Sequence, residues 1–109
     1  PKMAFYEFRR YEIRPGKMDE WITLFHDEII PFQTARGMVI CGVFKDETGA
    51  DLFYWMRRFE NEAHREALYK AVYEDEGWTK GIAPRVGECI NRETIQVTRV
   101  APTSSSVLQ

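Results

Sequence analysis

The sequence lacks a strong excess of charge of either sign, and it lacks any long apolar run. Its 109 residues carry a net charge of −2 at neutral pH. The chain therefore has little electrostatic attraction for a polyanion, and we expect no nucleic-acid partner. No apolar run approaches the ~20 residues that a membrane-spanning helix requires, so we expect no membrane partner. The first residues lack the charged and apolar regions of a signal peptide, which makes the cytoplasm the expected location.

Cysteine and histidine are scarce. The two cysteines, Cys41 and Cys89, are expected to be reduced thiols, because no secretory context favours a bridge. The two histidines, His26 and His64, belong to no cluster with metal-ligand spacing, so we predict no metal site. They would also be the only histidine ligands available to a haem. Phosphate loops and nucleophile elbows are absent, and we predict no cofactor.

Aromatic side chains, in contrast, are abundant. The chain has seven Phe, five Tyr and three Trp, more than a minimal core of this size needs. Such an excess is typical of a pocket wall or a subunit interface. The length predicts one domain over residues 1–101, followed by a flexible Ser-rich tail over residues 102–109.

Hydrophobic periodicity and turn signals predict an alternation of strands and helices. The predicted elements are a strand and turn over 5–16, a helix over 17–35 kinked at Pro31, strands over 38–45 and 52–59, a helix over 61–75, a loop over 79–88 and a strand over 89–100. This β-α-β-β-α-β order is the ferredoxin-like α+β pattern, a four-stranded antiparallel sheet with two helices on one face. The opposite face is then bare and apolar, so we expect a homodimer that buries it.

The first strand carries a polar group on one face. Side chains alternate along a strand, so Glu7, Arg9 and Tyr11 share the face that Phe5 and Ile13 also occupy. One interpretation is a structural Glu–Arg ion pair that Tyr11 covers. The other is the wall of a small, partly polar pocket, in which Arg9 or Tyr11 binds a ligand oxygen and Glu7 orients Arg9.

Several motifs together resemble one known family. They are Tyr6-Glu7-Phe8-Arg9-x-Tyr11, Pro15-Gly16-Lys17, the Trp/Phe-rich helix with Pro31 and Gly37, then Gly42, Arg58-Phe59-Glu60, Arg65 and Asp75-x-x-Trp78. From about residue 5 to 100 the chain resembles the NIPSNAP family, which belongs to the dimeric α/β-barrel proteins. The resemblance implies the fold and a dimer. It does not imply a particular reaction, because the wider superfamily includes cofactor-free oxygenases, haem-degrading enzymes, isomerases and cyclases.

Two functional hypotheses follow. In the first, a homodimer binds an apolar, partly oxygenated molecule, such as an aromatic or enolisable compound, and oxidises, isomerises or cyclises it. Arg9 and Tyr11 would bind an enolate oxygen and His26 would move the proton. The predicted ligand-binding residues are Glu7, Tyr54, Trp55, Arg65, Tyr69 and Trp78. In the second hypothesis, the chain is a non-catalytic dimerisation or adaptor module.

Overall fold

The computed structural model describes residues 4–109, so the first three residues of the predicted domain lie outside the described part. In chain order the elements are β1 (Phe5–Glu12), α1 (Met18–Leu24), η1 (Phe25–Ile29), α2 (Ile30–Thr34), β2 (Val39–Lys45), β3 (Leu52–Phe59), α3 (Glu62–Tyr73), η2 (Gly77–Ile82), α4 (Ala83–Cys89), η3 (Arg92–Thr94) and β4 (Gln96–Val100). Here η1 and η2 are π-helical, and η3 is a short 3-10 helix.

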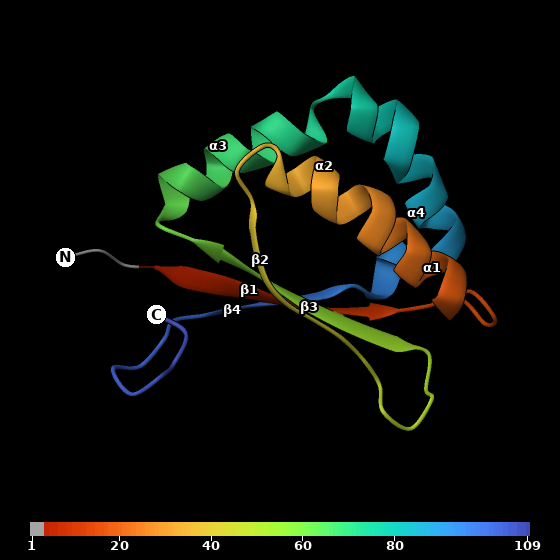
Figure 1. Cartoon of the computed structure of the whole chain (residues 1–109), viewed down its shortest axis with the longest axis horizontal. Helices are drawn as coiled ribbons and strands as arrows, with labels where there is room; N and C mark the ends of the chain where they lie inside the picture. The colour runs from red at the N-terminus through yellow and green to blue at the C-terminus, as the bar shows by residue number, and fades with distance from the viewer. Residues whose placement is uncertain (1–3) are drawn as a thin grey trace.

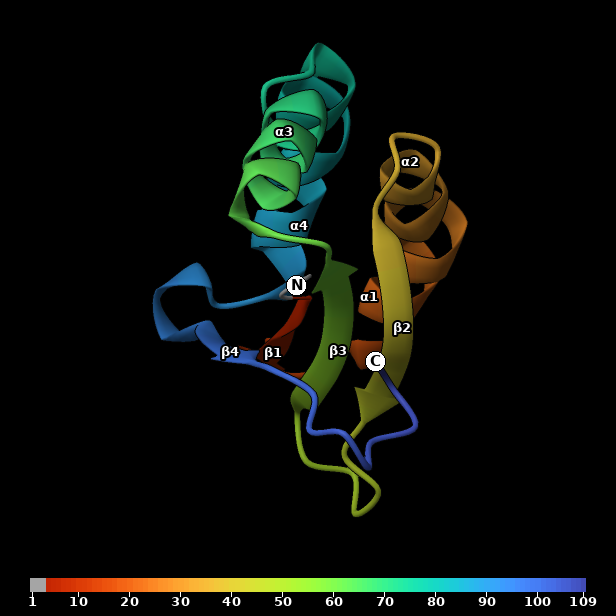
Figure 2. The ribbon, with the colours of Figure 1, turned by 90° about the vertical axis from the view of Figure 1, so that its left-hand side faces the viewer.

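The four strands form one antiparallel sheet in the order β2-β3-β1-β4. The helices lie together on one face of it, with the α1–α2 run beside the α3–α4 run (Figures 1 and 2). We call the face under the helices the inner face and the opposite one the outer face. The predicted α+β ferredoxin-like fold is therefore confirmed.

The two central strands alternate as their sequences predict. In β1, Phe5, Glu7 and Tyr11 are buried on the inner face, whereas Phe8 on the outer face is 41% exposed. In β3 every second residue from Phe53 to Phe59 is buried. Each strand thus supplies one row of large side chains to the core beneath the helices.

The first helical run changes its hydrogen-bond pattern before it reaches Pro31. A π-helical stretch, η1, separates α1 from α2, and the Ile30 N–H donates to the Phe25 carbonyl. Pro31 then falls in the first turn of α2, a position that tolerates its missing N–H.

Two predictions near the C-terminus are wrong. Residues 79–88 form most of η2 and α4 instead of a loop, and the last strand begins at Gln96 instead of residue 89. Pro84 suggested a break, yet it occupies the first turn of α4, where proline is favoured. Ile82, Val86 and Cys89 are buried at helical spacing against the sheet, and this burial outweighs the weak helix propensity of the glycines.

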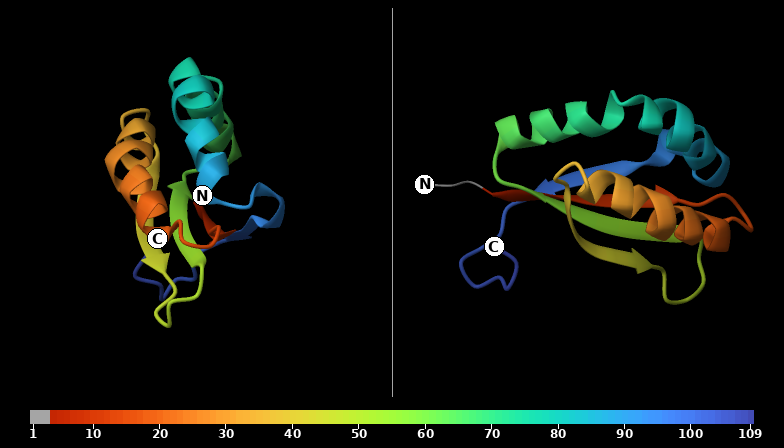
Figure 3. Two further views of the ribbon diagram at one scale, coloured as in Figure 1. Left: turned by 90° about the vertical axis from the view of Figure 1, so that its right-hand side faces the viewer. Right: turned by 45° about the horizontal axis from the view of Figure 1, so that its top comes forward.

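Among residues 4–109, no helix covers the outer face of the sheet. Its exposed apolar side chains come from three strands and are Phe8, Val39, Phe44 and Val100. The last residues fold back across part of this face (Figure 3). The Tyr6 hydroxyl donates to the Gln109 carbonyl (3.0 Å), and Arg58 Nε donates to the same oxygen (2.6 Å). The predicted tail is thus tied to the sheet in this structure.

Candidate functional site

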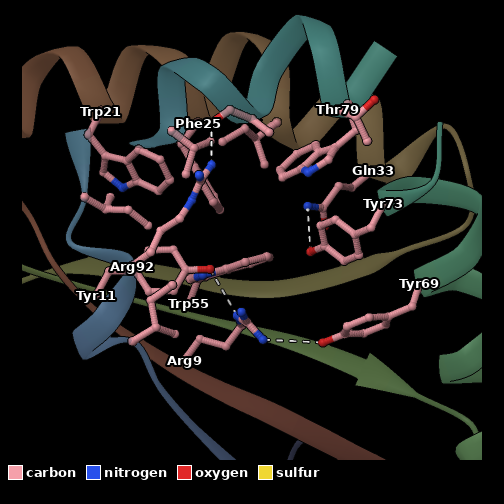
Figure 4. A pocket seen from close by; sticks show the side chains of 16 residues that line it. Arg9, Tyr11, Trp21, Phe25, Gln33, Trp55, Tyr69, Tyr73, Thr79 and Arg92 are labelled. Atoms are coloured by element: carbon pink, nitrogen blue, oxygen red, sulfur yellow. Dashed lines mark hydrogen bonds between the residues drawn. The ribbon is translucent and has the colours of Figure 1, made fainter. Parts of the chain in front are cut away.

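A cavity of about 410 Å³ lies between the inner face and the helices (Figure 4). Its wall combines side chains from β1 and β3 with side chains from every helical segment, including Arg92 of η3. The lining residues are Arg9, Tyr11, Trp21, Phe25, Ile29, Gln33, Trp55, Tyr69, Tyr73, Trp78, Thr79, Ala83, Val86, Ile90, Arg92 and Ile95. The three tryptophans of the chain are all among them.

The polar part of this wall begins at Arg9 on β1. Its guanidinium carbon lies 5.6 Å from the Trp55 ring centre and 5.7 Å from that of Tyr11. Arg9 Nε also donates to the Tyr11 hydroxyl at 3.1 Å. The aromatic rings hold the guanidinium at the cavity surface, since a cation is attracted to a ring face.

Glu7 lies behind Arg9 and is the centre of a buried polar cluster. Its carboxylate accepts from Arg57 Nη2 (2.8 Å), the Tyr69 hydroxyl (2.5 Å), Arg9 Nη1 (3.3 Å) and Arg65 Nε (3.3 Å). Burial raises the pKa of Glu7, but the charge of Arg57 and the hydrogen bonds from Tyr69 and Arg57 outweigh burial, and the net pKa lies below its usual value. One ionised carboxylate therefore serves three guanidinium groups.

Arg57 on β3 is completely buried. Besides Glu7, its guanidinium donates to Gln33 Oε1 (3.0 Å) and to the hydroxyls of Tyr73 (2.6 Å) and Tyr69 (2.9 Å). Burial, together with the hydrogen bond to Glu7, raises the pKa of Tyr69 to about 12, so its hydroxyl remains a donor. The polar atoms of Arg57 are thus satisfied, apart from Nε, which has no partner among the described residues, and one carboxylate faces three guanidiniums.

Arg57 and Gln33 were not predicted as site residues from the sequence. A signal for Arg57 was present, because strand alternation puts it between Trp55 and Phe59 on the inner face. The pairing of Arg57 with Glu7 depends on the β1–β3 register, in which the two residues are direct partners. Periodicity within one strand does not determine that register.

Most predicted site residues meet at the cavity. Arg9, Tyr11, Trp55, Tyr69 and Trp78 line it. Glu7 and Arg65 are not among the lining residues. Arg65 instead joins the cluster at Glu7 and pairs with Glu62 at 2.9 Å.

Two predicted site residues lie elsewhere. His26 is exposed, because its neighbour Phe25 and Ile29 one turn later take the inward positions of the π-helical stretch. It is not among the lining residues, so its expected position at the pocket is wrong. Tyr54 lies on the outer face, where its ring centre is 6.3 Å from that of Phe8. Strand alternation separates it from Trp55, since successive side chains point to opposite faces.

Metal and membrane features can be assessed for residues 4–109. These residues bring together no three His, Cys, Asp or Glu side chains that could hold a metal ion. Within the same range, no helix combines the length and the apolar character that crossing a membrane demands.

Curated relatives share this sequence over most of its length. Protein NipSnap homolog 3B of Mus musculus is 28% identical over 101 residues, which is 91% of this chain and 40% of that protein. Protein NipSnap homolog 3A of Homo sapiens is 27% identical over 100 residues, which is 90% of this chain and 40% of that protein. The chain thus spans about 40% of the length of the curated relatives it matches.

Solved structures agree in fold. A NIPSNAP family protein from Agrobacterium tumefaciens str. C58 is 27% identical with a TM-score of 0.87, and the match covers 97% of this chain and 99% of that one. A second NIPSNAP family protein from that strain has a TM-score of 0.88 at 21% identity, covering 98% and 95% of the two chains. The family model for NIPSNAP matches residues 6–105. The chain belongs to the NIPSNAP family.

Proposed function

We propose that this domain binds an apolar, partly oxygenated small molecule in the cavity beneath the helices. The observation that carries the proposal is a cavity of about 410 Å³ with Arg9 and Tyr11 in an otherwise largely aromatic and aliphatic wall. Sites for small molecules have this character, with a volume of ~300–1,000 Å³ and few polar groups that fix orientation. A flat aromatic or enolisable compound would stack on the rings and direct its oxygen toward Arg9.

The cavity supports binding more strongly than proton transfer. Arg9 can stabilise a developing enolate oxygen, because its charge acts in a site of low polarity. Catalysis of oxidation, isomerisation or cyclisation also needs a base, and the described lining residues include neither a histidine nor a carboxylate. We therefore favour a ligand that is already ionised in solution, so that no lining residue has to remove its proton.

We also propose a homodimer formed through the outer face. Phe8 and Phe44 are 41% and 53% exposed there, and Val39 and Val100 are 46% and 39% exposed. Apolar groups gathered on a face without a covering layer are typical of an interaction surface. The same observation favours the second candidate function, a dimerisation or adaptor module that uses no ligand.

A cavity-filling variant separates these functions. Ala83 lines the cavity, so Ala83→Phe would occupy it, whereas Ala67→Phe adds the same side chain at an exposed position of α3. We expect aromatic metabolites to raise the melting temperature of the wild type and of Ala67→Phe, because binding to the native state stabilises it. Ala83→Phe should not respond. If no compound of a broad aromatic set shifts the wild type, the adaptor function is favoured instead.

A further inference from the structure

We infer that the cavity takes an anionic ligand, a carboxylate or enolate on an aromatic body, with the anion held by Arg9. This inference rests on the proposed binding function and specifies the chemical class of its ligand. Three features of the described residues support it: the charge count of the cluster, the unused donor of Arg9 and the excess of donors elsewhere in the wall.

The charge count leaves positive charge at the cavity. Arg57 and Arg9 form ion pairs only with Glu7 among the described residues, at 2.8 and 3.3 Å. Arg65 also reaches Glu7, and its second partner, Glu62, is shared with Arg99. One carboxylate thus balances in part the fully buried guanidinium of Arg57, the mostly buried one of Arg9 and the one of Arg65 at the edge. A buried charge without a full counter-charge is costly, and an anionic ligand would reduce that cost.

Arg9 is the member of the cluster that a ligand can reach. Its side chain is 14% exposed, whereas that of Arg57 is fully buried. Arg9 Nε binds Tyr11, and Nη1 reaches Glu7 and Tyr69 at 3.3 and 3.4 Å, near the long limit for a hydrogen bond. Nη2 has no hydrogen-bond partner within the described residues. Figure 4 shows the guanidinium at the cavity between Tyr11 and Tyr69.

The rest of the wall also offers donors. Arg92 lines the cavity as well, and its guanidinium donates to the Ala83 carbonyl. A carboxylate or enolate supplies acceptors only, so it matches this wall better than a neutral amide, which brings donors of its own. Arginine binds a carboxylate through charge-assisted hydrogen bonds, about twice as strong as neutral ones.

Paired probes test the inference. Calorimetric titrations of the full chain would compare trans-cinnamate with cinnamamide and 2-naphthoate with 2-naphthamide, since each acid and its amide share a shape and differ in charge. We expect each acid to bind about tenfold or more tightly than its amide. In Arg9→Gln this preference should fall to about twofold or less, because the charged donor is gone. Lys80→Gln, which removes a charge from the exposed surface, should keep the preference.

The outcomes distinguish the inference from the function on which it rests. If acid and amide bind the wild type equally well, the anionic ligand class is wrong and the binding function stands. If an acid preference persists in Arg9→Gln, the anion is held elsewhere and the assignment to Arg9 is wrong. If neither member of any pair binds the wild type, both the inference and the proposed function fail. The comparison within the wild type decides the ligand class even if Arg9→Gln does not fold.

Discussion

At the scale of single residues, Glu7 and Arg57 are the oppositely charged pair buried in the core. They face each other across the β1–β3 ladder, and neither is more than 1% exposed. Desolvation makes such a pair a weak source of net stability, but removing one partner leaves the other as an unpaired buried charge. Replacing either residue alone should therefore lower the free energy of unfolding more than the net contribution of the intact pair would suggest.

We predict that Glu7→Gln destabilises the protein by about 3–5 kcal/mol, since Arg57 then lacks its counter-charge. Urea denaturation at pH 7 would measure the loss. Glu66→Gln, a matched change at an exposed position of α3, should stay within about 0.5 kcal/mol of the wild type. A loss below about 1 kcal/mol for Glu7→Gln would mean that Tyr69, Tyr73 and Gln33 alone stabilise the guanidinium.

The lowered pKa of Glu7 predicts the direction of the acid response. The native protein binds the Glu7 proton less readily than the unfolded chain, whose value is near 4.5. The stabilisation of the native state by ionised Glu7 is therefore fully present above about pH 4.5. It is lost as the pH falls through the lower native pKa of Glu7. Urea denaturation between pH 7 and 3 would measure the free energy of unfolding at each pH. This free energy should fall less steeply with decreasing pH for Glu7→Gln than for the wild type. If the free energy of unfolding falls equally steeply in both proteins, carboxylates other than Glu7 cause the acid sensitivity.

At the scale of elements, β1 and β3 fix the floor of the cavity and the helices close it. The helix α3 positions Tyr69, and its start is defined by Asn61, whose side chain accepts a hydrogen bond from the His64 N–H at 2.8 Å. The His64 ring in turn accepts from the Glu60 N–H at 3.0 Å. This capping arrangement sets where the helix begins relative to the sheet.

We predict that Asn61→Ala costs about 1 kcal/mol of stability through the lost N-cap, whereas Asn61→Asp retains most of it, because a carboxylate also accepts from the His64 N–H. Thermal and urea unfolding would measure both variants. Equal losses for Ala and Asp would contradict a capping role for this side chain.

At the scale of the whole molecule, the two faces of the sheet differ in what covers them. The inner face is covered by helices, and the outer face leaves Phe8, Phe44, Val39 and Val100 in contact with solvent, with residues 101–109 over one part (Figures 1 and 3). Another apolar surface would remove these side chains from water. A two-fold homodimer does this with a single self-complementary patch.

We predict that sedimentation equilibrium gives a mass about twice the 12.8 kDa of one chain. Phe44→Lys should shift the mass toward a single copy, because it puts a charge in the apolar patch. Phe44→Leu, which keeps the position apolar, should remain dimeric. A wild-type mass near 12.8 kDa would rule out the homodimer.

The sequence by itself determined the order of the main elements. It also determined which side chains share a face within each of the two central strands. Period-two patterns in residues 5–13 and 52–59 are strong because one face of each strand is buried and the other is not. The same patterns assigned Arg9 and Tyr11 to one face of the first strand, and Trp55 and Phe59 to one face of the strand over 52–59. Prediction failed where local signals and burial disagree, as at α4, in which Pro84 and the glycines suggest a loop although Ile82 and Val86 are buried.

Only the tertiary structure decided how the polar residues meet. The partnership of Glu7 with Arg57 depends on a strand register, and the contributions of Gln33 and Tyr73 depend on how two helices sit above the sheet. The exposure of His26 depends on one widened helical turn that rotates the residues around it. Contacts between residues 16 to 62 positions apart, such as these, are set by packing of the whole chain. Local periodicity carries no information about them.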